Sequence, residues 1–240
     1  GEGKSILSNS AIAIKNNKKS KVTLIIIFVR ALDLLVLVFL WNCIYRFNNF
    51  KLRHICVFSI KKLMKSKNNL VLVGMMGSGK STIGLLISKK LNIKFVDVDN
   101  VIEKNMNMPI SEIFKMKGEN FFRNLEEKIT IKLLSSLNTV ISLGGGGFIN
   151  DKTRSEVINN NYSFWLSCST SIIINRIKNN KKRPLVSNLD DGKIAELITN
   201  RSKIYTKAQF KINCDKLTKK EIVNKIVKLY EHNKTKSKYN

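Results

Sequence analysis

The run Gly74-Met-Met-Gly-Ser-Gly-Lys-Ser-Thr82 constrains the fold of this chain more than any other feature. It fits the phosphate-binding pattern G-x-x-x-x-G-K-[ST], it follows the apolar run 70–73, and residues 83–91 after it predict a helix. Glycines let several backbone N–H groups face one phosphate, and a helix N-terminus adds partial positive charge. An ordinary glycine turn is the alternative, and the complete match between a strand and a helix disfavours it.

The loop predicts a nucleotide site with separate roles for its polar residues. Lys80 can reach the β- and γ-phosphates of ATP, and the Ser81 hydroxyl can bind Mg²⁺. The residues expected around the nucleotide are Gly77, Ser78, Gly79, Lys80, Ser81 and Thr82.

From residue 70 onward, short apolar segments alternate with helical patterns, which is typical of a parallel α/β sheet. We therefore expect an α/β fold of three layers, in which helices flank a central parallel sheet. Strands are expected at 70–73, 94–99, 140–143, 162–166 and 210–213. Helices are expected at 83–91, 170–178, 190–207 and 218–231, with two short ones in 110–127 separated by a glycine break after Lys117.

Two carboxylates end the expected second strand. Alternation along a strand places Asp97 and Asp99 on the same side, near the edge where open α/β sheets bind ligands. Beside a phosphate loop, one acid would suit Mg²⁺ and the other an acceptor hydroxyl. The alternative is an exposed strand end or a helix cap.

Three further features have both a functional and a structural interpretation. The glycines 144–147 directly follow a strand, so they allow close approach to a ligand or form a permissive loop. Arg123 could bind an acidic substrate through its planar fork, but the residues alone favour pairing with Glu126 or Glu127 along the helix. The basic loop 179–188 is either a lid over ATP or a solvated run of charge.

Charge and cysteines limit the other function classes. The formal net charge of +26 in 240 residues invites a nucleic-acid interpretation, but the lysines are spread along the chain without a base-reading motif. We therefore expect no nucleic-acid partner. The four cysteines form no C-x-x-C pair, which indicates reduced thiols, no metal cluster and a cytoplasmic location. They are Cys43, Cys56, Cys168 and Cys214.

Residues 1–63 differ in composition from the expected domain at 64–240. The apolar run 22–41 has the length of a membrane span, but Arg30 and Asp33 interrupt it and make insertion marginal. This N-terminal extension could be a membrane anchor, a targeting segment that is removed, or upstream sequence that is not part of the protein. We favour the third interpretation, because Met64 is suitably placed as a start shortly before the first strand. A tether or an organelle location applies only if the extension is real.

Taken together, residues 70 to about 232 resemble the shikimate kinase family, small P-loop enzymes with a nucleoside-monophosphate-kinase-like fold. The resemblance rests on the order of motifs and covers none of the chain before Met64. Besides the phosphate loop and D-x-D, these motifs are E-I-F-x-x-x-G-E-x-x-F-R-x-x-E at 112–126, G-G-G from 144, R-P-L at 183–185 and R-x-x-x-Y at 201–205.

The resemblance implies phosphoryl transfer from ATP to the 3-hydroxyl of shikimate, on the route to chorismate and the aromatic amino acids. We also expect the protein to be a monomer. The resemblance implies that Asp97 supports the metal, that Asp99 binds the shikimate hydroxyl as the candidate base, and that Arg183 of the lid approaches the phosphoryl group. Residues 213–216 fall where the family's adenine loop lies. Arg123, Arg201, Gly145 and Gly146 would hold the shikimate carboxylate and line its pocket.

Other functions remain to be weighed. A related kinase acting on gluconate would share the fold, but the pair Arg123 and Arg201 favours shikimate. A non-catalytic, membrane-tethered nucleotide-binding module is suggested by the run 22–41, and the intact substrate-side residues argue against it.

The sequence departs from the family pattern at two positions, namely the fourth glycine, Gly147, and the absence of an acid after Tyr205.

Overall fold

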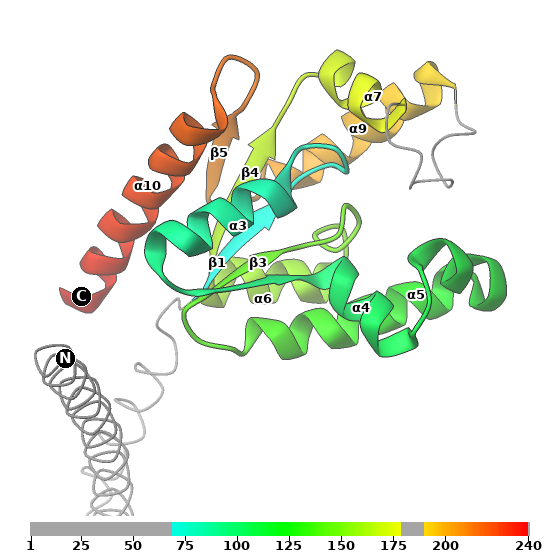
Figure 1. The fold of residues 1–240 in the computed structure, drawn as a ribbon, viewed down its shortest axis with the longest axis horizontal. Coiled ribbons are helices and arrows are strands. Elements are labelled where there is room, and N and C mark those ends of the chain that lie inside the picture. The colour runs from blue at the N-terminus through cyan, green and yellow to red at the C-terminus, as the bar shows by residue number, and fades with distance from the viewer. Residues whose placement is uncertain (1–68, 179–189, 240) are drawn as a thin grey trace, which may run out of the picture. The chain divides into compact units, whose positions relative to one another are not determined.

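A computed structural model describes residues 69–178 and 190–239 of the chain, with side chains as far as residue 235. Its centre is a five-stranded sheet in the order β2-β3-β1-β4-β5, and every pairing is parallel. The expected parallel α/β fold is therefore confirmed (Figure 1). The strands are β1 (Leu70–Val73), β2 (Lys94–Asp97), β3 (Thr139–Ser142), β4 (Tyr162–Ser167) and β5 (Phe210–Asn213).

Helices cover both faces of the sheet because the central strands are apolar on both faces. Leu70 and Leu72 of β1 belong to one buried cluster, whereas Val71 and Val73 belong to the other. The first cluster is closed by α3 (Lys80–Leu91) and α10 (Lys219–Tyr239). The second is closed by α4 (Val98–Met106), α5 (Ile110–Leu134), α6 (Asp151–Asn160), α7 (Thr170–Lys178) and α9 (Asp191–Tyr205).

The strand order places a crevice at one edge of the sheet. The chain runs from β1 to the far strand β2, returns through β3, and then crosses to β4 on the other side of β1. Ligands bind at such reversals, outside the carboxyl ends of the strands. The phosphate loop, the two carboxylates and the glycine run all lie at strand ends or directly after them at this edge.

Some boundaries differ from those expected from the sequence. The first helix begins at Lys80 rather than residue 83, and the second strand ends at Asp97 rather than residue 99. Helix α4 begins at once after that strand and was not expected. Helix α6 was also missed, because it is mostly polar and buries only Thr153 and Val157, which leaves little apolar periodicity.

Helix α5 confirms the expected break. Gly118 has φ 79° and ψ 169° inside the span Ile110–Leu134, so two helical pieces meet there at a bend. A positive φ suits glycine, which has no Cβ to clash with the backbone. The bend separates the short piece at 110–117 from the long piece that carries Arg123.

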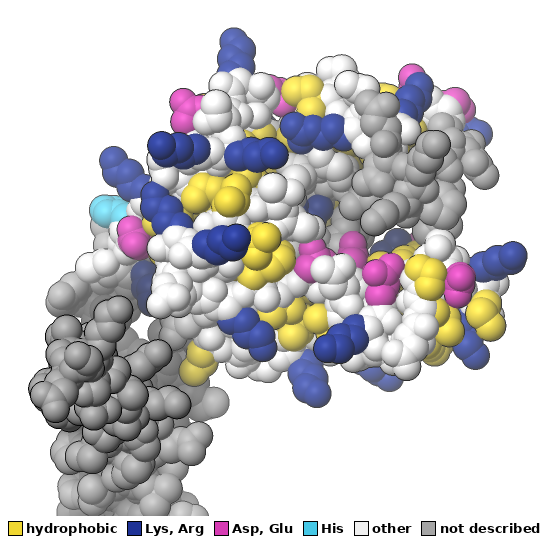
Figure 2. All heavy atoms as spheres, in the orientation of Figure 1, with side chains coloured by type: hydrophobic (Ala, Val, Ile, Leu, Met, Phe, Trp, Pro, Cys, Tyr) yellow, Lys and Arg dark blue, Asp and Glu magenta, His cyan; other side chains and the backbone are white. Residues whose placement is uncertain are grey.

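Several expectations cannot be placed on the structure. The extension 1–63, its apolar run 22–41 and the lid loop with Arg183 lie outside the described residues. Within the described ranges, no helix has the length and apolar character needed to cross a bilayer. On the face that Figure 2 shows, lysine and arginine side chains are scattered between apolar and acidic ones and do not gather into one stripe.

Candidate active site

The phosphate loop joins β1 to α3 in a tight conformation. Gly77 and Gly79 have φ 81° and φ 91°, in the region that favours glycine. The buried Lys80 ammonium lies folded over the loop and donates hydrogen bonds to the carbonyl oxygens of Gly74 at 2.8 Å and Met75 at 3.0 Å. The loop thus holds a cation beside backbone that is shaped to receive phosphate.

A cavity of about 260 Å³ opens at this loop. Five of the six predicted loop residues line it, the exception being Ser78, which is buried in the loop. Residues from several strand ends complete the wall, so the site is assembled from the crevice edge of the sheet. The lining residues are Met76, Gly77, Gly79, Lys80, Ser81, Thr82, Asp97, Asp99, Ser142, Leu143, Gly145 and Arg176.

Ser81 and Asp97 together form an oxygen-donor pair that fits Mg²⁺. The Ser81 hydroxyl donates to Asp97 Oδ2 at 2.5 Å, and both residues line the cavity. Across the described residues there is no group of three His, Cys, Asp or Glu side chains that could hold a metal. Mg²⁺ commonly takes one or two protein oxygens and fills its other positions with water and substrate phosphates, so a hydroxyl and a carboxylate are suitable ligands for it.

Asp97 and Asp99 lie together, but for a different reason from the one the sequence suggested. They do not alternate along one strand, because β2 ends at Asp97 and Asp99 belongs to the first turn of α4. Asp97 caps that helix, and its Oδ1 accepts a hydrogen bond from the Asp99 backbone N–H at 3.1 Å. The helix cap fixes both carboxylates at the cavity wall.

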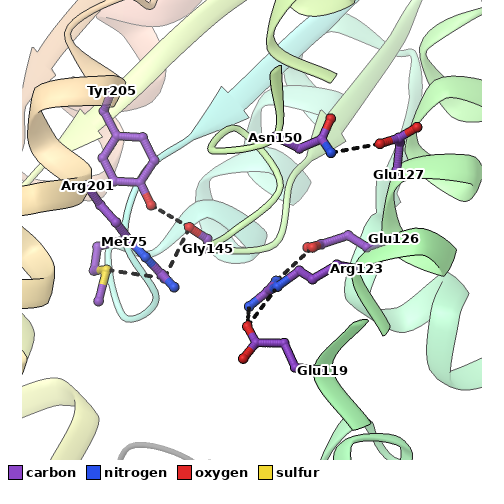
Figure 3. Close-up of polar contacts among 9 residues, drawn as sticks. All are labelled: Met75, Glu119, Arg123, Glu126, Glu127, Gly145, Asn150, Arg201 and Tyr205. Carbon is purple, nitrogen blue, oxygen red and sulfur yellow. Dashed lines mark hydrogen bonds and ion pairs between the residues drawn. The ribbon is translucent and has the colours of Figure 1, made fainter. Parts of the chain in front are cut away.

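The structural and the functional interpretation of Arg123 are compatible. Its guanidinium donates to Glu126 at 2.8 Å and to Glu119 at 3.1 and 3.2 Å, as Figure 3 shows. The expected pair with Glu126 is confirmed, whereas the alternative partner Glu127 instead accepts hydrogen bonds from Asn150 and Lys152. Arg123 also lies directly against Gly146, in the glycine loop formed by residues 144–147.

Glu126 is a site residue that sequence reasoning treated only as a partner of Arg123. Its side chain is 5% exposed, whereas that of Glu119 is 65% exposed, so Arg123 has one buried and one solvated acid. Burial alone would lower the pKa of the Arg123 guanidinium, but the charges and hydrogen bonds of Glu126 and Glu119 raise it. Glu126 therefore holds the guanidinium in place.

Arg201 and Tyr205 of α9 face the glycine loop from the other side (Figure 3). Arg201 donates to the Gly145 carbonyl oxygen at 3.3 Å, and the Tyr205 hydroxyl donates to the same oxygen at 2.5 Å. Burial raises the pKa of Tyr205 to about 12, so the hydroxyl stays protonated and keeps its role as donor. Tyr205 thus fixes the loop that Arg201 contacts.

Side chains from neighbouring helices approach the backbone of the glycine loop closely. A Cβ atom at Gly144 would lie 2.5 Å from Glu126 Oε1 and 2.6 Å from Asp99 Oδ1. A Cβ atom at Gly146 would lie 2.4 Å from Arg123 Nη1. The close-approach interpretation of the glycine run is supported, since two arginines and two acids from three elements meet its backbone.

Arg176 is a second residue that the sequence analysis did not single out. It lies on α7, lines the cavity and donates to the Gly77 carbonyl oxygen at 3.2 Å. Its sequence neighbourhood, Ile174-Asn-Arg-Ile-Lys178, is that of an ordinary amphipathic helix, so no local signal marks it. Only the packing of α7 against the phosphate loop reveals it.

Comparisons with known proteins agree on one family. The sequence model of the family described as shikimate kinase matches residues 76–231. The chain is 40% identical over 159 residues to the shikimate kinase of Sulfurihydrogenibium sp. (strain YO3AOP1), covering 66% of this chain and 95% of that protein. It is 41% identical over 165 residues to the shikimate kinase of Thermodesulfovibrio yellowstonii, covering 68% and 95%.

Solved structures give the same result. The shikimate kinase from Acinetobacter baumannii in complex with shikimate superposes with a TM-score of 0.66 at 27% identity, covering 72% of this chain and 97% of that chain. The shikimate kinase from Aquifex aeolicus superposes with a TM-score of 0.59 at 34% identity, covering 69% and 97%.

Proposed function

Because the chain belongs to the shikimate kinase family, we propose that it transfers the γ-phosphoryl group of ATP to the 3-hydroxyl of shikimate. One observation carries the proposal beyond the family name. A single cavity is lined by the phosphate loop, by Asp99 and by Gly145 of the loop that Arg201 contacts. A nucleotide phosphate and a small acid can therefore meet in one place.

The phosphate loop binds and orients the nucleotide. Lys80 already lies at the loop with its ammonium on two carbonyl oxygens, and it moves from these to the β- and γ-phosphates when the nucleotide binds. The N-terminus of α3 adds backbone N–H groups toward the same phosphates. Phosphoryl transfer needs placement and charge neutralisation more than covalent help, and this part of the site provides both.

The metal site consists of Ser81 and Asp97. Bound there, Mg²⁺ would neutralise charge on the phosphate oxygens as it builds up during transfer. Asp97 also caps α4, because its other oxygen accepts from the Asp99 backbone N–H and so holds Asp99 in position. In this proposal, the position of the metal ligand is thereby linked to the position of the acceptor-side acid.

Asp99 acts on the acceptor. It lines the cavity from the first turn of α4, close to Gly144 of the glycine loop. From there its carboxylate accepts a hydrogen bond from the 3-hydroxyl and takes the proton as the phosphoryl group is transferred. It need not be a strong base, because the proton can leave late in a loose transition state.

Arg123 and Arg201 hold the shikimate carboxylate from opposite sides of the glycine loop, with Gly145 and Gly146 as the floor. Planar guanidinium groups suit a carboxylate because they form paired, charge-assisted hydrogen bonds. Glu119 is exposed and accepts from two nitrogens of Arg123, so it is the partner that the substrate carboxylate replaces. Glu126 keeps its bond and maintains the orientation of Arg123.

Arg183 belongs to the lid and approaches the transferring phosphoryl group in this proposal. The proposal also retains the monomeric state and the cytoplasmic location expected from the sequence.

The test is a coupled ADP-release assay on the full chain with Mg²⁺ and ATP, comparing shikimate, gluconate and no acceptor. We expect ADP release only with shikimate, and its loss in Lys80→Ala, which controls for contaminating kinases. Release with gluconate alone would assign a different acceptor. Acceptor-independent release, or none from folded protein, would contradict the proposal.

A further inference from the structure

Two cysteines lie opposite each other just beyond the ends of β4 and β5. The parallel register pairs Leu166 with Ile212 and Ser167 with Asn213, so Cys168 and Cys214 come next on the two strands. The Cys214 N–H donates to the Ser167 carbonyl oxygen at 2.9 Å, which continues the ladder to this position. Both thiols are free in the structure.

Their spacing suits a disulfide bond. Neighbouring strands lie about 4.8 Å apart, and directly opposite residues of a parallel pair point to the same face. A disulfide bridges Cα atoms that are about 4.4–6.8 Å apart. The two thiols also contact each other, since a hydrogen bond between them is the main influence on the acidity of each.

The two thiols differ in reactivity. The hydrogen bond from Cys214 and the charge of Arg176 lower the pKa of the Cys168 thiol, although its burial opposes this. The hydrogen bond to Cys168 and burial raise the pKa of Cys214, whose residue is 8% exposed. Because the thiolate is the form that reacts, we expect an oxidant to react with Cys168 before Cys214.

Cys168 is connected to the nucleotide site through two contacts. Its sulfur lies 3.9 Å from the Ser78 carbonyl oxygen of the phosphate loop and 3.9 Å from Arg176 Nη1. The same nitrogen of Arg176 donates to the Gly77 carbonyl oxygen at 3.2 Å, and Arg176 lines the cavity. A change at this sulfur therefore acts on both the loop and an arginine of the cavity wall.

We propose that Cys168 and Cys214 are a peroxide-responsive thiol pair whose closure to a disulfide weakens nucleotide binding. The Cys168 thiolate attacks a peroxide oxygen, an S–O bond forms, the O–O bond breaks, and hydroxide leaves as water after taking a proton. Cys214 then attacks the sulfenic sulfur, an S–S bond forms, and the S–O oxygen leaves as a second water. Two thiols and one hydrogen peroxide thus give one disulfide and two waters, and a thiol reductant reverses the change.

Closure would alter the nucleotide site through the sulfur's lost contacts. Bonding to Cys214 takes away the thiol hydrogen that Cys168 donates toward the Ser78 carbonyl oxygen, and it leaves a weaker hydrogen-bond acceptor for Arg176. The effect on binding rests on the proposed function, because it assumes that the cavity takes ATP. The thiol chemistry does not depend on that assumption.

The first experiment tests the chemistry alone, on the full chain carrying Cys43→Ser and Cys56→Ser so that only the pair reacts. After treatment with about one equivalent of hydrogen peroxide, we expect a mass loss of two hydrogen atoms and one linked peptide pair joining Cys168 to Cys214. In Cys214→Ser we expect dimedone to label Cys168, and in Cys168→Ser we expect neither product. Absence of the linked peptides, together with no dimedone labelling of Cys168, would overturn the proposal.

The second experiment measures Mg²⁺·ATP binding by calorimetry on the oxidised protein and on the same sample after reduction. We expect the dissociation constant to rise roughly three- to tenfold on oxidation, as for the loss of hydrogen bonds that hold the phosphate loop and Arg176, and to recover on reduction. The Cys168→Ser protein treated in parallel should show no change. An unchanged constant in protein proven to carry the disulfide would overturn the link to the nucleotide. If the reduced protein also failed to bind ATP, the proposed function would fail, while the mass result would still decide the thiol chemistry.

Discussion

At the scale of single residues, Asp99 is the group on which the proposed chemistry depends most. Asp99→Asn keeps the shape of the side chain and removes its capacity to accept a proton. We expect kcat to fall about 10²- to 10⁴-fold, the usual contribution of general base catalysis. The dissociation constant for ATP should stay within about twofold, because the phosphate loop is unchanged. Steady-state kinetics with calorimetry would check this, and wild-type kcat in the variant would remove Asp99 from the mechanism.

Glu126 offers a test of positioning, with its neighbour Glu127 as a matched control. Glu126→Gln removes the buried charge that pairs with Arg123, so the guanidinium loses its fixed orientation. We expect KM for shikimate to rise about tenfold, which is about 1.4 kcal/mol, with kcat nearly unchanged. Glu127→Gln, which disturbs only Asn150 and Lys152, should leave both constants within about twofold. Equal effects of the two substitutions would indicate general destabilisation instead.

The sequence alone predicts the site residues that belong to short local motifs. Lys80, Ser81, Asp97 and Asp99 belong to short motifs beside an apolar strand, and they lie at the cavity as expected. Glu126 could be recognised only as one end of a helix pair, because its importance comes from its burial. No local sequence pattern marks Arg176, since it reaches the phosphate loop through the packing of α7.

At the scale of elements, two glycines of the glycine loop differ in how closely other side chains approach them. Gly146→Ala would place a Cβ atom 2.4 Å from Arg123 Nη1, the far end of a flexible side chain, so the arginine moves and the fold survives. A Cβ atom at Gly147 meets only ordinary contacts, the nearest at 3.5 Å. We expect Gly146→Ala to raise KM for shikimate at least about fivefold, or ~1 kcal/mol, and Gly147→Ala to have little effect.

The same pair of variants should share the melting temperature of the wild type to within a few degrees, because neither glycine has a positive φ. Thermal unfolding read beside the kinetics would separate the two causes. A large fall in melting temperature for Gly146→Ala would show that the loop cannot give way, and the kinetic change would then no longer report on Arg123.

Strands were easier to predict than helices in this fold. The central strand β1 is a continuous buried apolar run, and the positions of all five strands agree with the expected ones to within two residues. Helix α4 was missed because its start overlaps the end of β2, where Asp97 serves both elements. The long piece of α5 was underestimated, because a sequence pattern gives the glycine break but not the packing that continues the helix to Leu134.

At the scale of the whole molecule, one buried side chain joins the three central strands of the described fold. Among the described residues, the two core clusters are built from positions between 70 and 230. Asn69 begins the described fold and is fully buried, with hydrogen bonds to the carbonyl oxygens of Leu134 and Ser136 and to Asn161 Oδ1. It also accepts from the Thr139 N–H, so one side chain ties the start of β1 to the starts of its two neighbours.

The family model matches residues 76–231, which predicts that a chain of residues 64–240 keeps both stability and activity. We expect its free energy of unfolding in urea to match that of the full chain to within about 1 kcal/mol, and its kcat and KM for shikimate to agree within about twofold. Asn69→Ala in the same truncated chain should cost about 2–4 kcal/mol, because it leaves several buried polar groups without partners. Folded 64–240 protein that lacks activity would show that residues 1–63 contribute to the site. If Asn69→Ala left the free energy of unfolding of the truncated chain unchanged, the buried amide would have no measurable part in joining the three central strands. Other contacts would then account for the stability of this part of the sheet.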